Sequence, residues 1–153
     1  MMHDQSIPLQ ALKRPGAPRS AAPFAVRGGP LWLLRLEGVS VLCAAGLAYA
    51  ATGAHWGDAA LWFLLPDISM LFYFVGPRAG AIAYNAAHSY IGPIVLGSYA
   101  CLDGRSAGVA WALVWVAHIA LDRALGYGLK YRHGFHATHL GRVGPRRRAV
   151  SPQ

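Results

Sequence analysis

The sequence predicts an all-α integral membrane protein, an antiparallel bundle of four helices with both termini on the cytoplasmic side. Apolar residues make up 55% of the chain and charged residues 13%, about half the charged share of a typical soluble domain. The apolar residues gather in four stretches, each long enough to cross a hydrocarbon core of about 30 Å as a helix. Most basic residues lie outside these stretches, as expected of a membrane protein.

The four predicted transmembrane helices span residues 31–51, 59–75, 79–101 and 107–125. Short turns that contain Gly and polar residues separate them, at 52–58, 76–78 and 103–106. Because loops this short join neighbouring helices, consecutive helices should run antiparallel to one another.

The segments outside the predicted helices are polar or rich in proline. Residues 1–30 carry five prolines and several basic residues, so we expect a flexible cytoplasmic tail. Residues 143–153 form a second basic tail. Residues 126–142 are too polar to span but contain Leu, Tyr and Phe, which predicts a segment on the cytoplasmic membrane surface, where its basic residues favour anionic headgroups.

The basic residues also set the predicted orientation. With both tails and the 76–78 turn in the cytoplasm, thirteen of the 14 Lys and Arg residues lie on that side and Arg105 lies on the other. This bias predicts a multi-pass protein of the bacterial inner membrane, whose partner is the lipid bilayer. Basic and aromatic residues are not interleaved, which argues against nucleic-acid binding. The oligomeric state stays open.

An alternative interpretation of the first helix is a cleaved signal peptide, because Ala48-Tyr49-Ala50 follows an apolar run. More than 30 residues precede that run, and Arg35 and Glu37 lie where a signal sequence is apolar. We therefore expect the first helix to be retained.

Polar residues inside the four helices fall at similar depths. At a rise of about 1.5 Å per residue, Glu37, Asp67 and His118 lie about 9–12 Å from the cytoplasmic ends of their helices. By the same count Asn85 lies about 9 Å deep and His88 about 14 Å deep. An ionised side chain at the bilayer centre costs about 2.5–3.5 kcal/mol. We therefore expect these groups to face one another around a hydrated pocket, with Asp67, the deepest carboxylate, at its centre.

Local spacing supports this convergence. His118 and Asp122 are four residues apart and share a helix face, so Asp122 can orient the imidazole or bind a metal ion with it. Asn85 and His88 share a face in the same way. Pro66 directly precedes Asp67, and a proline there leaves a backbone carbonyl unpaired and kinks the helix. Pro93 should release the carbonyl of Ser89 in the same manner, next to His88.

These patterns suggest roles for the residues of the layer. Asp67 and Glu37 are candidate catalytic acids, bases or metal ligands, and His88, His118 and Asp122 are candidate metal ligands. A second possible metal site is the repeat of His133, His136 and His139, which has no Cys or second ligand pair beside it.

Several separated motifs resemble one protein family. They are LLRLEG (33–38), LLPDISMLFYFVGPRAGAIAYNAAH (64–88), WVAHIALDRALGYGLKY (115–131) and FHATHLGR (135–142). Together they are similar to the small bacterial membrane proteins catalogued as domain of unknown function 4260, over about residues 31–142. The resemblance implies a four-helix membrane domain.

The resemblance also implies which residues of this sequence occupy the motif positions of the family. Its motif positions here are Glu37, Pro66, Asp67, Tyr84, Asn85, His88, His118, Asp122, Arg123, Lys130 and His139. Those outside the catalytic and metal-ligand sets, namely Tyr84, Asn85, Arg123, Lys130 and His139, are candidate ligand-binding residues. The family pattern does not include His133 and His136, which weakens the three-histidine site.

The sequence leaves three functions open. One is a module that binds or transports a small ligand, proton, metal ion, quinone or non-covalent haem, with His88 and His118 as axial ligands in the haem case. The second is an intramembrane enzyme that acts on a lipid-like substrate. The third is a structural membrane subunit whose polar layer only fixes the packing of the helices.

Overall fold

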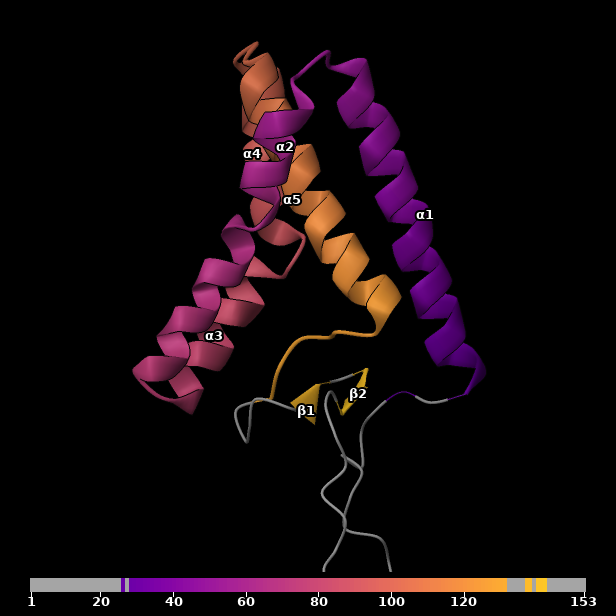
Figure 1. The fold of residues 1–153 in the computed structure, drawn as a ribbon, viewed down its shortest axis with the longest axis vertical. Coiled ribbons are helices and arrows are strands. Elements are labelled where there is room, and N and C mark those ends of the chain that lie inside the picture. The colour runs from indigo at the N-terminus through magenta and orange to yellow at the C-terminus, as the bar shows by residue number, and fades with distance from the viewer. Residues whose placement is uncertain (1–25, 27, 132–136, 139, 143–153) are drawn as a thin grey trace, which may run out of the picture.

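Helices dominate the structure, a computed structural model that describes residues 26, 28–131, 137–138 and 140–142. The first pass is α1 (Gly29–Ala51), and the second is α2 (Trp56–Phe63) followed by the 3-10 helix η2 (Leu65–Phe74). The third is α3 (Pro77–Ala87) with α4 (Ile91–Leu102), and the fourth is α5 (Ser106–Leu125). Figure 1 shows these four passes, which confirm the predicted all-α class.

Three passes are long and apolar enough to cross a membrane. They are Gly29–Ala51, Trp56–Phe74 and Ser106–Leu125. The third predicted helix, 79–101, is not continuous, because it is broken between Ala87 and Ile91. Pro93 explains the break. It has no N–H to donate to Ser89 and its ring would clash with that carbonyl, whereas the first turn of a new helix accepts a proline.

Pro66 marks a second irregularity. The ten residues of η2 wind as a 3-10 helix directly after α2, although 3-10 runs longer than three or four residues are uncommon and often mark functional positions. Pro66 occupies the start of this run, where its missing N–H is tolerated. The side chain of Asp67 therefore projects from an irregular part of the second pass.

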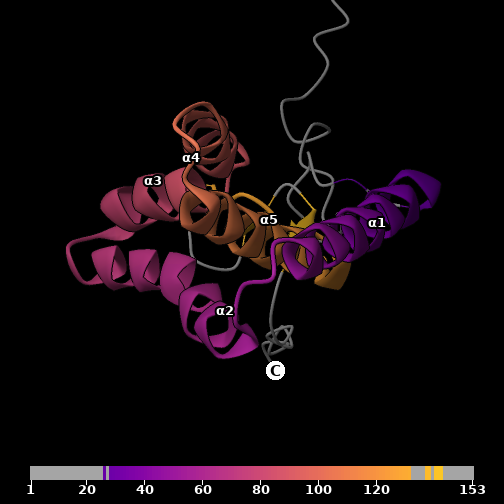
Figure 2. The same cartoon turned by 90° about the horizontal axis from the view of Figure 1, so that it is seen from above.

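Helix α5 is the central element. It packs against α1, α2 and α4, while α3 packs against η2. Figure 2 shows α5 lying between α1 and α4. Close approach to α1 depends on Gly38, because a Cβ at that position would lie 2.7 Å from the backbone nitrogen of Ala124 and 3.0 Å from the carbonyl oxygen of Ala120. A small residue at such a contact lets two membrane helices meet backbone to backbone.

This contact predicts that Gly38→Val destabilises the fold. Valine forces α1 away from α5, and overpacking of this kind costs about 1–3 kcal/mol. Thermal unfolding in detergent should show the loss, while Gly46→Val, at a position with open space around it, should leave the unfolding temperature nearly unchanged. Equal effects of the two substitutions would rule out the close helix contact.

The segment after α5 contains a small strand pair that the sequence did not predict. Strand β1 (Ala137–Thr138) pairs antiparallel with β2 (Gly141–Arg142), and Thr138 also forms a bridge to Lys130. Figure 1 shows this hairpin beside the end of α5 and the start of α1. Leu140, between the two strands, lines a cavity together with Glu37 and Arg123.

Candidate metal centre

Three candidate residues from three different passes converge. Asp67 comes from η2, His88 from the break between α3 and α4, and His118 from α5. Their ligand atoms lie within 4.8 Å of one another. We call these three residues the metal triad. Both histidines are buried, with 1% and 4% of their surface exposed, whereas 41% of the Asp67 side chain is exposed.

The distances within the metal triad fit a single metal ion. Asp67 Oδ1 lies 3.4 Å from His88 Nε2 and 3.6 Å from His118 Nε2, and the two Nε2 atoms are 3.2 Å apart. Ligands bound tetrahedrally to zinc at about 2.0–2.1 Å lie about 3.3 Å from each other. The three ligand atoms therefore have nearly the spacing of one triangular face of the tetrahedron around a zinc ion.

His88 is held in the orientation that a metal ligand needs. Its Nδ1 lies 2.9 Å from the backbone carbonyl of Tyr84, which can only accept a hydrogen bond. Nδ1 therefore carries the proton, and Nε2 presents its lone pair to the metal triad. The Tyr84 ring stacks on the imidazole, with centroids 3.7 Å apart, and fixes its plane.

His118 is positioned by packing. Phe63 contacts the imidazole edge to face, with ring centroids 5.0 Å apart. Its Nδ1 is buried and has no hydrogen-bond partner among the described residues. A buried nitrogen without a partner is costly, and a metal ion on Nε2 would leave Nδ1 protonated and in need of an acceptor.

The same geometry excludes haem between the two histidines. Axial imidazoles on one iron need Nε2 atoms about 4 Å apart, twice a metal–nitrogen bond of about 2 Å. The observed separation is 3.2 Å, and the rings meet edge to face. A flat macrocycle does not fit between them.

Asp122 lies beside the metal triad and not within it. Its Oδ2 is 3.6 Å from His88 Nε2 and accepts a hydrogen bond of 2.9 Å from the Tyr84 hydroxyl. No hydrogen bond joins Asp122 to His118 among the described residues, because the Nδ1 of His118 has no partner and its Nε2 faces His88. The carboxylate that completes the metal triad is Asp67.

The ammonium group of Lys130 lies over the ring of Tyr84. Its Nζ lies 4.0 Å from the centroid of the Tyr84 ring, on which His88 stacks. Only 7% of this residue is exposed. Burial lowers the pKa of Lys130, and the charges of Asp122 and Asp67 oppose the shift only in part.

This lowered pKa predicts a pH-dependent contribution to stability. Between the folded pKa and the ordinary value of 10.5, the unfolded chain binds more protons, so raising the pH through this window stabilises the fold. Lys130→Met keeps the apolar stem and removes the charge. Wild type should therefore gain stability relative to Lys130→Met as the pH rises towards 10.5, measured by unfolding in detergent. A difference that does not change with pH would contradict the burial of this charge.

Asn85 anchors the chain that follows α5. Its Nδ2 donates to the carbonyl of Lys130 at 2.9 Å, and its Oδ1 accepts from the Lys130 backbone N–H at 2.7 Å. Both ends of the amide are therefore engaged by one residue, and Asn85 places Lys130 against Tyr84.

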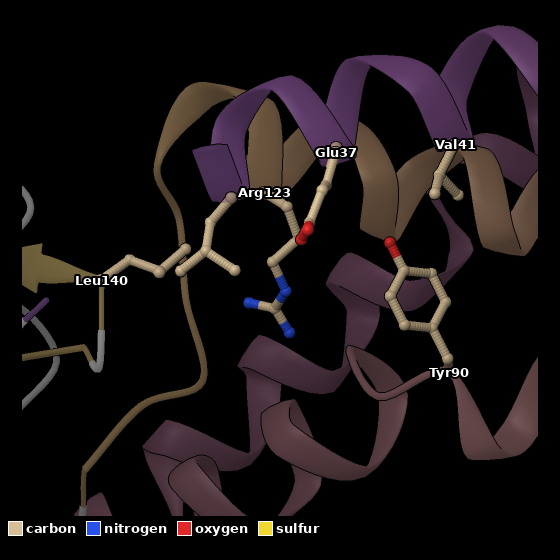
Figure 3. A pocket seen from close by; sticks show the side chains of 7 residues that line it. Glu37, Val41, Tyr90, Arg123 and Leu140 are labelled. Atoms are coloured by element: carbon tan, nitrogen blue, oxygen red, sulfur yellow. The ribbon is translucent and has the colours of Figure 1, made fainter. Parts of the chain in front are cut away.

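Glu37 lies apart from the metal triad. It lines a cavity of about 220 Å³ with Tyr90, Arg123 and Leu140. Figure 3 shows the Glu37 carboxylate and the Tyr90 hydroxyl pointing into the space beside Arg123. Among the described residues no ion pair joins Glu37 to Arg35 or Arg123. The predicted shared site therefore contains three of the four residues expected in it.

Arg123 connects this cavity with the metal triad. Its Nη2 donates to the backbone carbonyl of His88 at 2.9 Å, and its Nη1 donates to the carbonyl of Tyr127 at 3.0 Å. The guanidinium thus holds the broken part of the third pass at a fixed distance from α5. His133, His136 and His139, the residues of the second possible metal site, lie outside the described residues.

A comparison with protein families identifies a family to which most of the chain is similar. The family described as Domain of unknown function (DUF4260) matches residues 32–143, most of the chain. The chain belongs to the DUF4260 family. The match confirms the resemblance seen in the separated motifs, and the DUF4260 region contains every residue of the metal triad. No curated protein and no solved structure matches this DUF4260 chain.

Proposed function

We propose that this DUF4260 protein is a membrane metalloenzyme that holds one divalent transition-metal ion on Asp67, His88 and His118. The observation that carries the proposal is the triangle of ligand atoms with edges of 3.2, 3.4 and 3.6 Å. We further propose that it resides in the inner membrane with both termini in the cytoplasm, which the charge bias of the sequence supports.

Three protein ligands would leave a bound ion one free coordination position, which supports catalysis over a purely structural role. Structural zinc sites use four protein ligands, whereas catalytic sites use three and leave a position for water or substrate. Two His and one carboxylate suit zinc, and the same set binds iron(II) in oxygenases. When bound, zinc supplies a Lewis acid and lowers the pKa of a water ligand, so the reaction class we propose is hydrolysis.

The surrounding residues have roles that follow from their contacts. The carbonyl of Tyr84 sets the tautomer of His88, and Arg123 fixes the backbone of His88. Asp122 lies 3.6 Å from His88 Nε2 and would be the candidate general base for a water molecule on the ion. The partial exposure of Asp67 leaves that side of the centre accessible.

A second candidate is proton or metal-ion transport. His88 Nε2 lies between two carboxylates, 3.4 Å from Asp67 and 3.6 Å from Asp122, an arrangement that can pass a proton from one to the other. Proton flux into liposomes that contain the protein, lost in His88→Gln, would favour this function over hydrolysis.

The experiment that tests the metal proposal compares two carboxylate substitutions. Asp67→Asn keeps size and hydrogen bonding but cannot ionise. We expect about one metal ion per chain in the purified wild type, measured by elemental mass spectrometry, as for a single three-ligand site. Asp67→Asn should lose nearly all of it and keep its fold.

The matched control is Asp58→Asn in the first turn of α2, a carboxylate that is not part of the metal triad. This variant should keep its metal. Equal metal content in Asp67→Asn and Asp58→Asn would refute the assignment.

A further inference from the structure

A second, larger cavity lies beside the metal triad and is almost entirely apolar. It has a volume of about 400 Å³, and its wall includes Trp62, Leu65, Phe72, Trp111 and Trp115. Volumes of this size are typical of small-molecule sites. The passes that contribute these five residues are two of those able to cross a bilayer, Trp56–Phe74 and Ser106–Leu125.

The wall of this cavity includes a sequence neighbour of each member of the metal triad. Its wall contains Pro66, Ala87 and Trp115. The first two directly precede Asp67 and His88, and Trp115 lies one turn before His118. The indole Nε1 of Trp115 donates to the carbonyl of Ala87 at 2.6 Å, which fixes this wall to the backbone next to His88.

One hydroxyl in the wall has no partner. Ser69 lines the cavity, and its Oγ is buried without a hydrogen bond among the described residues. It lies two residues after Asp67, on the same 3-10 helix. A buried hydroxyl left unpaired is costly, so a ligand oxygen near the metal triad would satisfy it.

We infer that this cavity holds the hydrocarbon chain of a membrane lipid and that the polar end of that lipid meets the metal triad. The inference rests on the proposed function and names its substrate class, a long-chain lipid with an oxygen-containing group. An apolar cavity formed by membrane-crossing passes is entered from the lipid phase and excludes water-soluble metabolites. The Ser69 hydroxyl orients the oxygen end of the chain.

The test uses the tryptophans of the cavity as reporters. Trp32 and Trp56 are exposed, at 65% and 61%, and do not line the cavity. Replacing both with Phe leaves Trp62, Trp111 and Trp115 as the fluorescent residues. A bromine-tagged long-chain fatty acid, added to the full-length protein in detergent, should quench them saturably. An unlabelled long-chain acid should reverse the quenching, and a short-chain brominated acid should not saturate.

Two substitutions locate the binding site. Leu96→Phe places a larger side chain in the cavity wall and should weaken fatty-acid affinity about tenfold, equivalent to about 1.4 kcal/mol. Ser69→Ala should weaken it severalfold. Leu102→Phe, at a position 90% exposed and outside the cavity, should have no effect. Quenching that does not saturate, or that is equal in Leu96→Phe and Leu102→Phe, would overturn the inference.

Metal content separates this inference from the proposed function. Zinc bound to wild type without saturable quenching would leave the metal proposal standing and refute the lipid site. Saturable quenching in a protein that binds no metal would support the cavity as a lipid-chain site and refute the metalloenzyme. Leu96→Phe should keep its metal, which shows that its lower fatty-acid affinity does not come from misfolding.

Discussion

Replacement of His118 by glutamine should lower the zinc affinity of the protein more than about 100-fold, a larger loss than removal of an outer-shell partner causes. His118 Nε2 lies 3.2 Å from His88 Nε2 and 3.6 Å from Asp67 Oδ1, so its loss leaves only two ligands. Titration of the detergent-solubilised protein against a chromophoric chelator measures the affinity directly.

The control for this substitution is His55→Gln. His55 caps α2 by accepting a hydrogen bond from the Gly57 N–H and does not belong to the metal triad. Its replacement should cost some stability but no zinc affinity. If His55→Gln and His118→Gln bind zinc equally well, the ion does not lie on His118.

Replacement of Arg123 by alanine should weaken zinc binding about 10–100-fold, the range seen for residues that support metal ligands from outside. The guanidinium donates to the carbonyls of His88 and Tyr127, and each hydrogen bond from a charged group contributes about 1.5–3 kcal/mol. Without these bonds the break that carries His88 is held to α5 less tightly, because the hydrogen bond from Trp115 to the carbonyl of Ala87 remains. Metal affinity and thermal stability should fall together.

Two further variants test the geometry of this contact. Arg123→Lys keeps the charge but cannot present two N–H groups in a fixed fork, so it should rescue little of the affinity. Arg105→Ala removes an exposed Arg that pairs with Asp103, a surface pair worth about 0–1 kcal/mol, and should leave zinc binding unchanged. Full rescue by Arg123→Lys would mean that charge alone is required.

Depth along each helix was predictable from the sequence. The count of residues from the helix ends placed Asp67, His88 and His118 in one layer, and the structure brings their ligand atoms together. The rotation of each helix about its axis was not predictable in the same way, because lipid-facing and interior-facing residues are both apolar. Glu37 shares the layer but faces the other cavity, so depth alone did not separate it from the metal triad.

Backbone irregularities were predictable in place but not in extent. Pro66 and Pro93 identified the two positions where hydrogen bonding fails. The ten-residue 3-10 helix that follows Leu64 and the full break at 88–90 depend on packing against α3 and α5.

The hairpin at 137–142 was missed because strands of two residues carry no alternating pattern. Its bridge to Lys130 arises only from tertiary contact.

X-ray absorption at the zinc edge of the purified wild-type protein tests directly whether an ion lies on Asp67, His88 and His118. We expect a first shell of two imidazole nitrogens with oxygen atoms from Asp67 and a further ligand, all at about 2.0–2.1 Å. Cys43 and Cys101 are free and exposed and should contribute no sulfur. Absence of bound metal, or a sulfur shell at about 2.3 Å, would contradict an ion held by Asp67, His88 and His118.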